Sequence, residues 1–574
     1  MKSTFKKISL YLPFLLIGSA AQAQYDQEII SVGDRKLTVE NAFKIDELPA
    51  TLDSVPKPLN IKYTIIPRQM NVTYSPKKIK AANLKLQDPL TKLYRGYAKA
   101  GIGLYVTPLL DFRYNSVRNR DWDYGIMANH FSSQGGVPKL AESAFSENYL
   151  GGYAKKYIEK HTVEAGLGYD RDAVHYYGFE LGDSKLKKDK YKQTFNTILG
   201  HAEVMSHYSD STKIEHRVRI DYRNMSDAFK SREGNFLLSA DGAKTIEDYR
   251  FGLLFQVDAN NLKIAQINTL FADTSFTVPE IVDVTTKGGI IRIEPTIHAK
   301  KNDLTADVGL AFAIETGEPE SAFHIYPKAY VSYSLFDDLF TPYAGVNGQL
   351  ERNSYNSLRT ENPFITHFTA LKNTSTDYNL YGGIRGTIMD NIVFNAKFSY
   401  ISYTDRPLFV NDVFFSAENR FNVVYEDMTE TRIMGELTYV HDKRLTVIAR
   451  LDLMKYKTNR QARPWNLPSA EITLDARYDL DDRFVVKLQL FTQGKRFASG
   501  TQRTGVLSPE TDLSEVEPIQ LRAFVDGSIG VEYRYTKRIS AFIELNNLSG
   551  GRYQRFYRYP VQSVMVLGGL TYSF

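Results

Sequence analysis

Residues 472–491 read ITLDARYDLDDRFVVKLQLF, and this stretch decides the fold class. Apolar side chains occupy every second position from Ile472 to Leu480 and again from Phe484 to Leu490, with mostly polar residues between them. The turn-forming pair Asp481-Asp482 separates the two runs. A period of two residues indicates strands with one apolar and one polar face, so the stretch predicts a β-hairpin.

The same alternation extends over residues 94–574. The strands of soluble sandwiches average about 5–6 residues. The alternating runs here are about twice as long, which is the length that a tilted strand needs to cross a bilayer. Lipid cannot satisfy the open edge of a sheet, so a membrane-spanning sheet must close. We therefore expect an all-β chain that forms a closed antiparallel transmembrane β-barrel of about 22 strands.

The connections between the alternating runs fall into two sets, which supports this interpretation. One set is tight and rich in turn formers, and Asn260-Asn261 is assigned to it. The other set is mostly long and polar, and residues 227–247 are assigned to it, with 235–238 open as an extra strand or a loop hairpin. Short turns at one end and long loops at the other are typical of bacterial outer-membrane barrels.

The composition fits a barrel wall and excludes several classes of protein. The chain has 38 Tyr and 33 Phe but only 2 Trp, and tyrosine and phenylalanine are typical of the aromatic girdles at the membrane interfaces. It has no cysteine, which excludes a disulfide scaffold and cysteine-ligated metals. A net charge of +5 over 574 residues does not favour nucleic acid as a partner.

The N-terminus has the pattern of a secretory signal peptide. Lys2, Lys6 and Lys7 precede a short apolar run, and Ala21-Gln22-Ala23 is an A-x-A cleavage site. We therefore predict a signal peptide over residues 1–23 and localisation in the cell outer membrane.

Residues 24–93 differ from the barrel, because repeated proline favours an extended backbone. Between Asp53 and Asp88 there are seven basic and two acidic residues, a net charge of +5 that equals the charge of the whole chain. This segment is predicted to be a solvated periplasmic tail, a lining of the lumen, or a docking segment for a partner protein. The candidate partner-binding residues are Lys57, Lys62, Arg68, Lys77, Lys78 and Lys80.

The last strand reads VMVLGGLTYSF over residues 564–574. It resembles the C-terminal β-signal of outer-membrane proteins, which has a glycine and two aromatic residues at fixed spacing. Gly569, Tyr572 and Phe574 match this signal, while Leu567 stands where a polar residue is usual. The resemblance implies recognition by the barrel-assembly machinery.

The start of the barrel, GYAKAGIGLYVTP over residues 96–108, resembles the first strand and tight first turn of TonB-dependent receptors. Its Tyr- and Lys-rich sequence is similar to that of the plugless, TonB-dependent-receptor-like members of the Bacteroidota. In that family the plug is a domain of well over a hundred residues. Only about 70 residues separate the signal peptide from the barrel, so the resemblance does not extend to a plug.

No motif in the sequence carries recognisable chemistry. The ten histidines form neither HExxH nor a metal-ligand spacing, and no GxSxG is present. We therefore expect no enzyme, no cofactor and no metal. The alternation points several charges into the lumen, where they form a selectivity surface or are simply paired with each other or hydrated. These residues are Arg450, Asp452, Asp475, Arg477, Lys487, Glu532 and Arg534.

The sequence favours a transport barrel that passes a polar solute across the outer membrane. An empty barrel of this width would leak, so we expect the N-terminal segment, inward-folded loops or another protein to fill the lumen. The alternative is a structural or assembly scaffold whose N-terminal segment recruits a periplasmic partner. The expected partners are outer-membrane lipid, the barrel-assembly machinery and a periplasmic or lumen-plugging protein.

Overall fold

The computed structural model describes most of the chain from residue 93 onward. The described residues are 93–179, 191–208, 210, 212–268, 280–317, 321–336, 338–367, 369–412, 419–442, 444–500, 513 and 516–574. The expected signal peptide and the candidate partner-binding lysines and arginine lie outside these residues.

Twenty-two strands form one antiparallel sheet. In chain order they are β1 (Gly96–Gly103), β2 (Thr107–Asn115), β3 (Trp122–Ser133), β4 (Phe145–Ile158), β5 (His161–His175), β6 (Lys192–Ser206), β7 (Glu215–Asp227), β8 (Arg232–Ile246), β9 (Tyr249–Asn268), β10 (Glu280–Lys301), β11 (Leu304–Gly317), β12 (Ala322–Tyr333), β13 (Phe340–Glu351), β14 (Thr374–Met389), β15 (Ile392–Asn411), β16 (Phe421–His441), β17 (Leu445–Thr458), β18 (Ala470–Leu480), β19 (Phe484–Gln493), β22 (Phe524–Arg534), β23 (Ile539–Asn546) and β26 (Met565–Ser573).

The remaining elements are short and lie in the loops. Strand β20 (Arg496–Ala498) pairs with β21 (Ile519–Leu521), and β24 (Gln554–Phe556) pairs with β25 (Tyr559–Pro560). Helix α3 (Tyr355–Glu361) lies between β13 and β14. No helix among the described residues is long and apolar enough to span a membrane.

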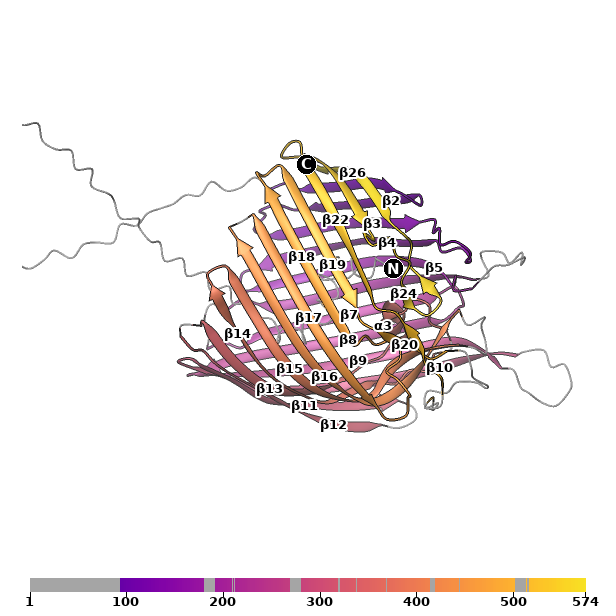
Figure 1. Cartoon of the computed structure of the whole chain (residues 1–574). Coiled ribbons are helices and arrows are strands. Elements are labelled where there is room, and N and C mark those ends of the chain that lie inside the picture. Colours follow the sequence, from indigo (N-terminus) through magenta and orange to yellow (C-terminus); the bar gives the residue numbers. More distant parts are fainter. Residues whose placement is uncertain are drawn as a thin grey trace, which may run out of the picture. The chain divides into compact units, whose positions relative to one another are not determined.

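The sheet closes on itself, because the first strand pairs with the last. Strands β1 and β26 are antiparallel neighbours from Tyr97↔Ser573 to Gly103↔Leu567. Gly96 and Phe574 extend this seam by exchanging two backbone hydrogen bonds of 2.8 and 2.9 Å. The predicted class, a closed antiparallel barrel of about 22 strands, is therefore confirmed (Figure 1).

The outer surface of the barrel is apolar and the inner surface is polar. Large aliphatic side chains that alternate along the strands face outward with high exposure, for example Leu167 at 72% and Leu570 at 61%. Their neighbours in the chain face the lumen, where charged groups of adjacent strands pair, as Lys99 does with Glu544 at 2.8 Å. An exposed apolar band around a closed sheet is the surface of a membrane-spanning barrel.

The two ends of the barrel carry different connections. Both ends of the sheet, Gly96 and Phe574, lie at the end where hairpins such as 159–160, 302–303 and 390–391 are tight. The opposite end carries the longest connections, including 352–373, 494–523 and 547–564. By the usual asymmetry of outer-membrane barrels the tight end is periplasmic and the long loops are extracellular, so we call these the inner and outer ends.

Two predicted connections are wrong. Residues 232–246 form strand β8 rather than a loop, and Asn260 and Asn261 lie inside β9 rather than in a turn. Asn260 misled the sequence interpretation because its amide points inward and donates to Glu233 at 3.1 Å. The real turns contain Lys230 and Glu247, which adopt positive φ angles of 69° and 53° without the usual glycine or asparagine signal.

The three residues of the C-terminal signal lie at the closure seam. Gly569 faces the lumen, and a Cβ atom at this position would lie 2.1 Å from the carbonyl oxygen of Ala100 on β1. Tyr572 and Phe574 face outward, and their rings stack at 5.6 Å between centroids. Gly569 is thus required for the close approach of the first and last strands, and the role of the signal in assembly stays a prediction.

We predict that Gly569→Val prevents barrel closure, while Gly568→Ala is tolerated. The neighbouring Gly568 faces outward, and its added Cβ would meet only the carbonyl oxygen of Phe542, at an ordinary 3.7 Å. The folded fraction is measured from the heat-modifiable mobility of the barrel on gels. Equal folding of the two variants would contradict the steric role of Gly569.

Candidate functional site

The extracellular loops pack together into an apolar cluster at the outer end of the barrel. We call the described residues 134–144, 176–179, 352–367, 369–373 and 547–564, with the adjoining strand ends, the outer cap. Its most buried aromatic and aliphatic side chains are Tyr176, Tyr355, Ile365, Phe421 and Tyr559, all exposed by 1% or less. These residues come from the β5, β13–β14, β16 and β23–β26 regions, so the cluster joins distant parts of the barrel wall.

The hairpin of β24 and β25 supplies the centre of the outer cap. The ring of Tyr559 stacks on Phe364 at 3.6 Å and meets Tyr177 edge-on at 4.9 Å. Its hydroxyl donates to the carbonyl oxygen of Asn419, and the Tyr177 hydroxyl donates to Pro560 at 3.0 Å. Both of these buried hydroxyls therefore have a backbone acceptor, as burial requires.

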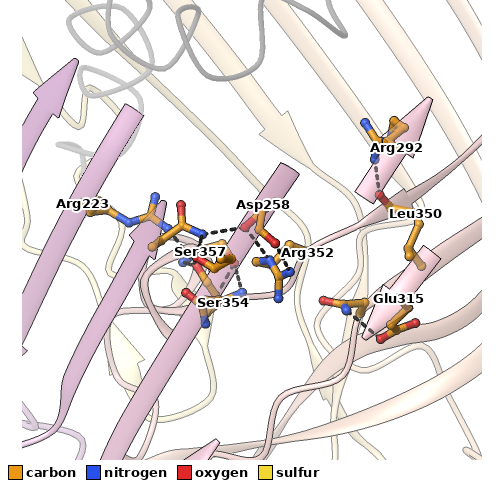
Figure 2. Close-up of polar contacts among 12 residues, drawn as sticks. Arg223, Asp258, Arg292, Glu315, Leu350, Arg352, Ser354 and Ser357 are labelled. Atoms are coloured by element: carbon orange, nitrogen blue, oxygen red, sulfur yellow. Dashed lines mark hydrogen bonds and ion pairs between the residues drawn. The ribbon is translucent and has the colours of Figure 1, made fainter. Parts of the chain in front are cut away.

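The base of the loop that carries α3 is tied to the barrel wall (Figure 2). Arg352 forms an ion pair with Asp258 of β9 at 2.8 Å, and Arg223 of β7 donates to the Ser354 hydroxyl at 3.4 Å. Ser354 and Ser357 form a capping box, which starts the helix at Tyr355. On the other side, Asn373 donates to Glu315 of β11 at 2.7 Å, and Arg292 donates to the carbonyl oxygen of Leu350.

Two buried carboxylates of the wall hold the helix itself. Glu233 of β8 accepts the backbone N–H groups of Tyr355 and Asn356 at 2.8 and 2.9 Å. Asp227 at the end of β7 accepts the Tyr355 hydroxyl at 3.0 Å. Glu233 is only 1% exposed, so its charge is stabilised by these donors and by the amide of Asn260.

Arg359 completes the attachment of α3. Its guanidinium donates to Asp172 of β5 at 2.8 Å and lies 4.6 Å from the ring of Phe195. Both members of the ion pair are almost fully buried. Removing one member of such a pair leaves an uncompensated buried charge, which costs about 3–5 kcal/mol. The loop is thus fixed in the mouth of the barrel by polar contacts as well as by apolar packing.

A second apolar cluster extends the outer cap toward β15 and β16. Trp465 is fully buried with Leu408 and Val424, and its indole N–H donates to Gln461 at 2.9 Å. The loop after β17 therefore folds onto the extended outer ends of these two strands.

The seven predicted lumen charges lie together on adjacent strands β17, β18, β19 and β22, and all face inward. Arg450 pairs with Asp452 at 2.8 Å and approaches Glu436 at 3.5 Å. Arg534 pairs with Asp479 at 3.1 Å, and Arg477 and Lys487 are register partners. Asp475 and Glu532 lie on the same inner face. The contacts show ion pairs for Arg450, Asp452 and Arg534, and a role of the seven charges in selectivity remains a prediction.

The sequence interpretation missed the residues that hold the outer cap. Asp172 and Glu233 look like ordinary strand carboxylates, and Arg359 like one charge in a polar loop. One signal could have indicated the cap, because Phe556-Tyr557 places an aromatic pair in a segment that was expected to be a polar loop. Among the described residues, no group of three or more histidine and acidic side chains is arranged to hold a metal ion.

No known protein-family model matches the sequence, and no curated protein matches it. Solved structures share the fold. The FrpB iron transporter from Neisseria meningitidis matches with a TM-score of 0.65 at 10% identity over 84% of this chain and 82% of its own. The siderophore receptor PirA from Acinetobacter baumannii gives 0.63 at 13%, over 84% and 81%. The pyoverdine outer membrane receptor FpvA from Pseudomonas aeruginosa gives 0.62 at 11%, over 84% and 79%.

These comparisons define the architecture. The 22-strand barrel of this chain shares its fold with an iron transporter, a siderophore receptor and a pyoverdine outer membrane receptor, and the predicted resemblance to TonB-dependent receptors is confirmed at the level of fold. The solved relatives in fold are transport receptors rather than enzymes.

We predict that Arg359→Ala loosens α3 by about 3–5 kcal/mol, because Asp172 would lose its buried partner. The measure is hydrogen–deuterium exchange of residues 355–361, which should speed up while exchange in the barrel strands stays unchanged. Arg463→Ala is the matched control, since Arg463 is an exposed residue of the loop between β17 and β18 and lies over the ring of Phe497. Unchanged protection of α3 in Arg359→Ala would contradict the anchoring role.

We also predict that acid weakens the outer cap through His367. Burial, reinforced by the nearby Arg420 guanidinium, lowers the pKa of His367 to about 3, and its ring stacks on Phe229 at 4.6 Å. This pKa is below the ordinary value, so the folded cap favours the neutral ring of His367. The resulting stabilisation of the folded cap is complete above about pH 6.5 and is lost as the pH falls toward 3. At pH 5 the loss is about 2 kcal/mol.

The variant His367→Phe keeps the stacked ring and removes the titrating group. Hydrogen–deuterium exchange of the cap should therefore rise less on acidification in this variant than in the unmodified chain. Every other titrating group is the same in both proteins, so the difference between their pH profiles isolates His367. Identical pH profiles would disprove the prediction.

Proposed function

We propose that this protein is an outer-membrane transport barrel for a polar solute, and that its outer cap is the gate on the extracellular side. The observation that carries this proposal is the loop of residues 352–373. Its helix is held inside the outer mouth by Arg359 and Asp172 and by Glu233. A wide barrel closed by its own loops is suited to controlled passage rather than to free diffusion.

The inner surface supports a polar cargo. Charged groups line the wall on many strands, and several of them are paired, as in Arg219 with Glu203 and Asp221, or Arg432 with Asp452. Such a lining presents hydrogen-bonding groups without a large excess of one charge. An iron transporter and a siderophore receptor share the fold, so a ferric siderophore is the first solute to test.

A two-by-two conductance experiment tests which segment closes the barrel. The four proteins are the full chain, a chain lacking residues 24–93, a chain whose residues 353–373 are replaced by a short Gly-Ser linker, and a chain with both changes. The linker is sterically feasible because the Asn353 amide lies 2.7 Å from the Thr374 hydroxyl, so the ends of the loop are adjacent.

We expect a stepwise rise of planar-bilayer conductance when the 353–373 loop is replaced. If only removal of residues 24–93 raises the conductance, the N-terminal segment is the barrier and the gate proposal is wrong. If no variant conducts and none passes a polar solute into liposomes, transport is wrong and the scaffold alternative is favoured. A pull-down with the 24–93 segment then tests for the periplasmic partner.

A further inference from the structure

Three polar side chains form a chain of hydrogen bonds at the outer ends of β3 and β4. The Ser132 hydroxyl lies 3.1 Å from Nε2 of His130. Nδ1 of His130 lies 2.7 Å from Oδ1 of Asn148. Asn148 in turn donates from Nδ2 to the carbonyl oxygen of Arg171 on β5, at 3.1 Å. A hydroxyl, an imidazole and a third group that orients the imidazole are thus aligned in one row.

The hydrogen bonds of this row determine the tautomer of the imidazole. The bond from Asn148 Nδ2 to the backbone of Arg171 fixes the amide, so Oδ1 is the atom that faces His130. Because Oδ1 can only accept, Nδ1 of His130 carries the proton. Nε2 therefore has its lone pair free to accept the proton of the Ser132 hydroxyl. This is the state in which a histidine activates a serine nucleophile.

The row faces away from the lumen. His130 and Ser132 alternate in register with Tyr124 and Ile126, which are 45% and 52% exposed on the outer surface, and Asn148 shares the face of Leu150. Neither the β3–β4 nor the β4–β5 pairing shows a register shift that would interrupt this alternation.

The row also lies at a defined height on the barrel wall. Ser132 is ten positions from Trp122, which lies at the inner end of β3. Ten residues of strand span about 33 Å, and at a strand tilt of about 40° this corresponds to about 25 Å along the barrel axis. That height is close to the thickness of the apolar band of an outer-membrane barrel. The site therefore faces the outer leaflet at the level where acyl chains meet polar headgroups.

We propose that Ser132, His130 and Asn148 form a hydrolytic site for acyl esters of membrane lipids in the outer leaflet. This inference is independent of the proposed transport function, because it uses the outer wall rather than the lumen. It also departs from the expectation that the chain is no enzyme. No local motif could have indicated it, since Asn148 follows Ser132 after a loop and joins His130 only through the β3–β4 pairing.

The reaction that this geometry supports is a two-step ester hydrolysis. The Ser132 oxygen attacks the ester carbonyl carbon while Nε2 of His130 takes the hydroxyl proton. The ester C–O bond then breaks, His130 returns the proton to the departing alkoxide, and the acyl group stays on Ser132. Water, deprotonated by His130, attacks this acyl-serine, and Ser132 is regenerated. The sum is ester plus water giving a fatty acid and an alcohol.

Arg171 adds a positive charge beside the row. It is the register partner of Asn148 on β5 and shares the outward face of Tyr169. A guanidinium on this face is suited to stabilise the oxyanion that develops on the carbonyl or to hold an anionic headgroup. The outward residues nearer the membrane centre, such as Ala128, Leu150 and Leu167, are apolar and offer contact surface for acyl chains.

The test uses the full chain in detergent with a fluorophosphonate probe, which forms a bond to an activated serine oxygen and releases fluoride. Substrates are a p-nitrophenyl ester, a diacyl phospholipid in mixed micelles and lipopolysaccharide, so that the two lipid sources of acyl esters are distinguished. Folding of every variant is checked by heat-modifiable mobility. The control is Ser146→Ala, because Ser146 is the register partner of Ser132 and faces the same way.

We expect the probe on Ser132, found by mass spectrometry of the labelled peptide, and hydrolysis of at least one substrate. Ser132→Ala and His130→Ala should lose about 10³-fold or more of the rate and all of the label, while Ser146→Ala keeps both. Asn148→Ala should lower kcat with little change in KM, and Asn148→Asp should restore part of it. Absence of label on Ser132, with hydrolysis no faster than in Ser132→Ala, would show that the row is only a polar belt at the membrane interface.

Discussion

The satisfaction of backbone hydrogen bonds in lipid is the constraint on which this structure depends. An unpaired N–H or C=O group in hydrocarbon costs several kcal/mol, so a sheet that crosses a membrane cannot leave an edge open. The seam between β1 and β26 meets this requirement, and Gly569 allows it by leaving room for the carbonyl oxygen of Ala100. Once the sheet is closed, period-two alternation separates the chain into an apolar outer surface and a polar lumen.

Closure creates a second physical problem, because 22 strands enclose more space than their own side chains fill. The outer cap addresses it at the extracellular end with two kinds of contact. Aromatic packing around Tyr559 and Phe364 excludes water, and the buried charges of Arg359, Asp172 and Glu233 hold α3 in a single position. Buried charges of this kind are costly to separate, so moving α3 away from the barrel wall requires a compensating interaction.

The sequence predicted the barrel well because the two-residue period is a local property of each strand. It failed at Asn260 and Asn261, where a turn-like pair lies in β9, and at Lys230 and Glu247, where turns lack the usual residues. The outer cap was predicted from the sequence only in part, since inward-folded loops were one of three expected ways to fill the lumen. Arg359 and Asp172 are 187 positions apart, and only the closed barrel brings them together. The row of Ser132, His130 and Asn148 depends on strand pairing in the same way.

We propose that the protein's own extracellular loops close the outer mouth of the barrel. The chain has no cysteine, so a single introduced cysteine reports accessibility directly. A membrane-impermeant maleimide added to intact cells should label Arg463→Cys, on the exposed outer loop between β17 and β18, rapidly and Asp475→Cys on the inner wall slowly. Lysed cells, in which the periplasmic side is open, should label Asp475→Cys faster. Equal and rapid labelling of both positions from outside would show that the loops do not close the outer mouth of the barrel.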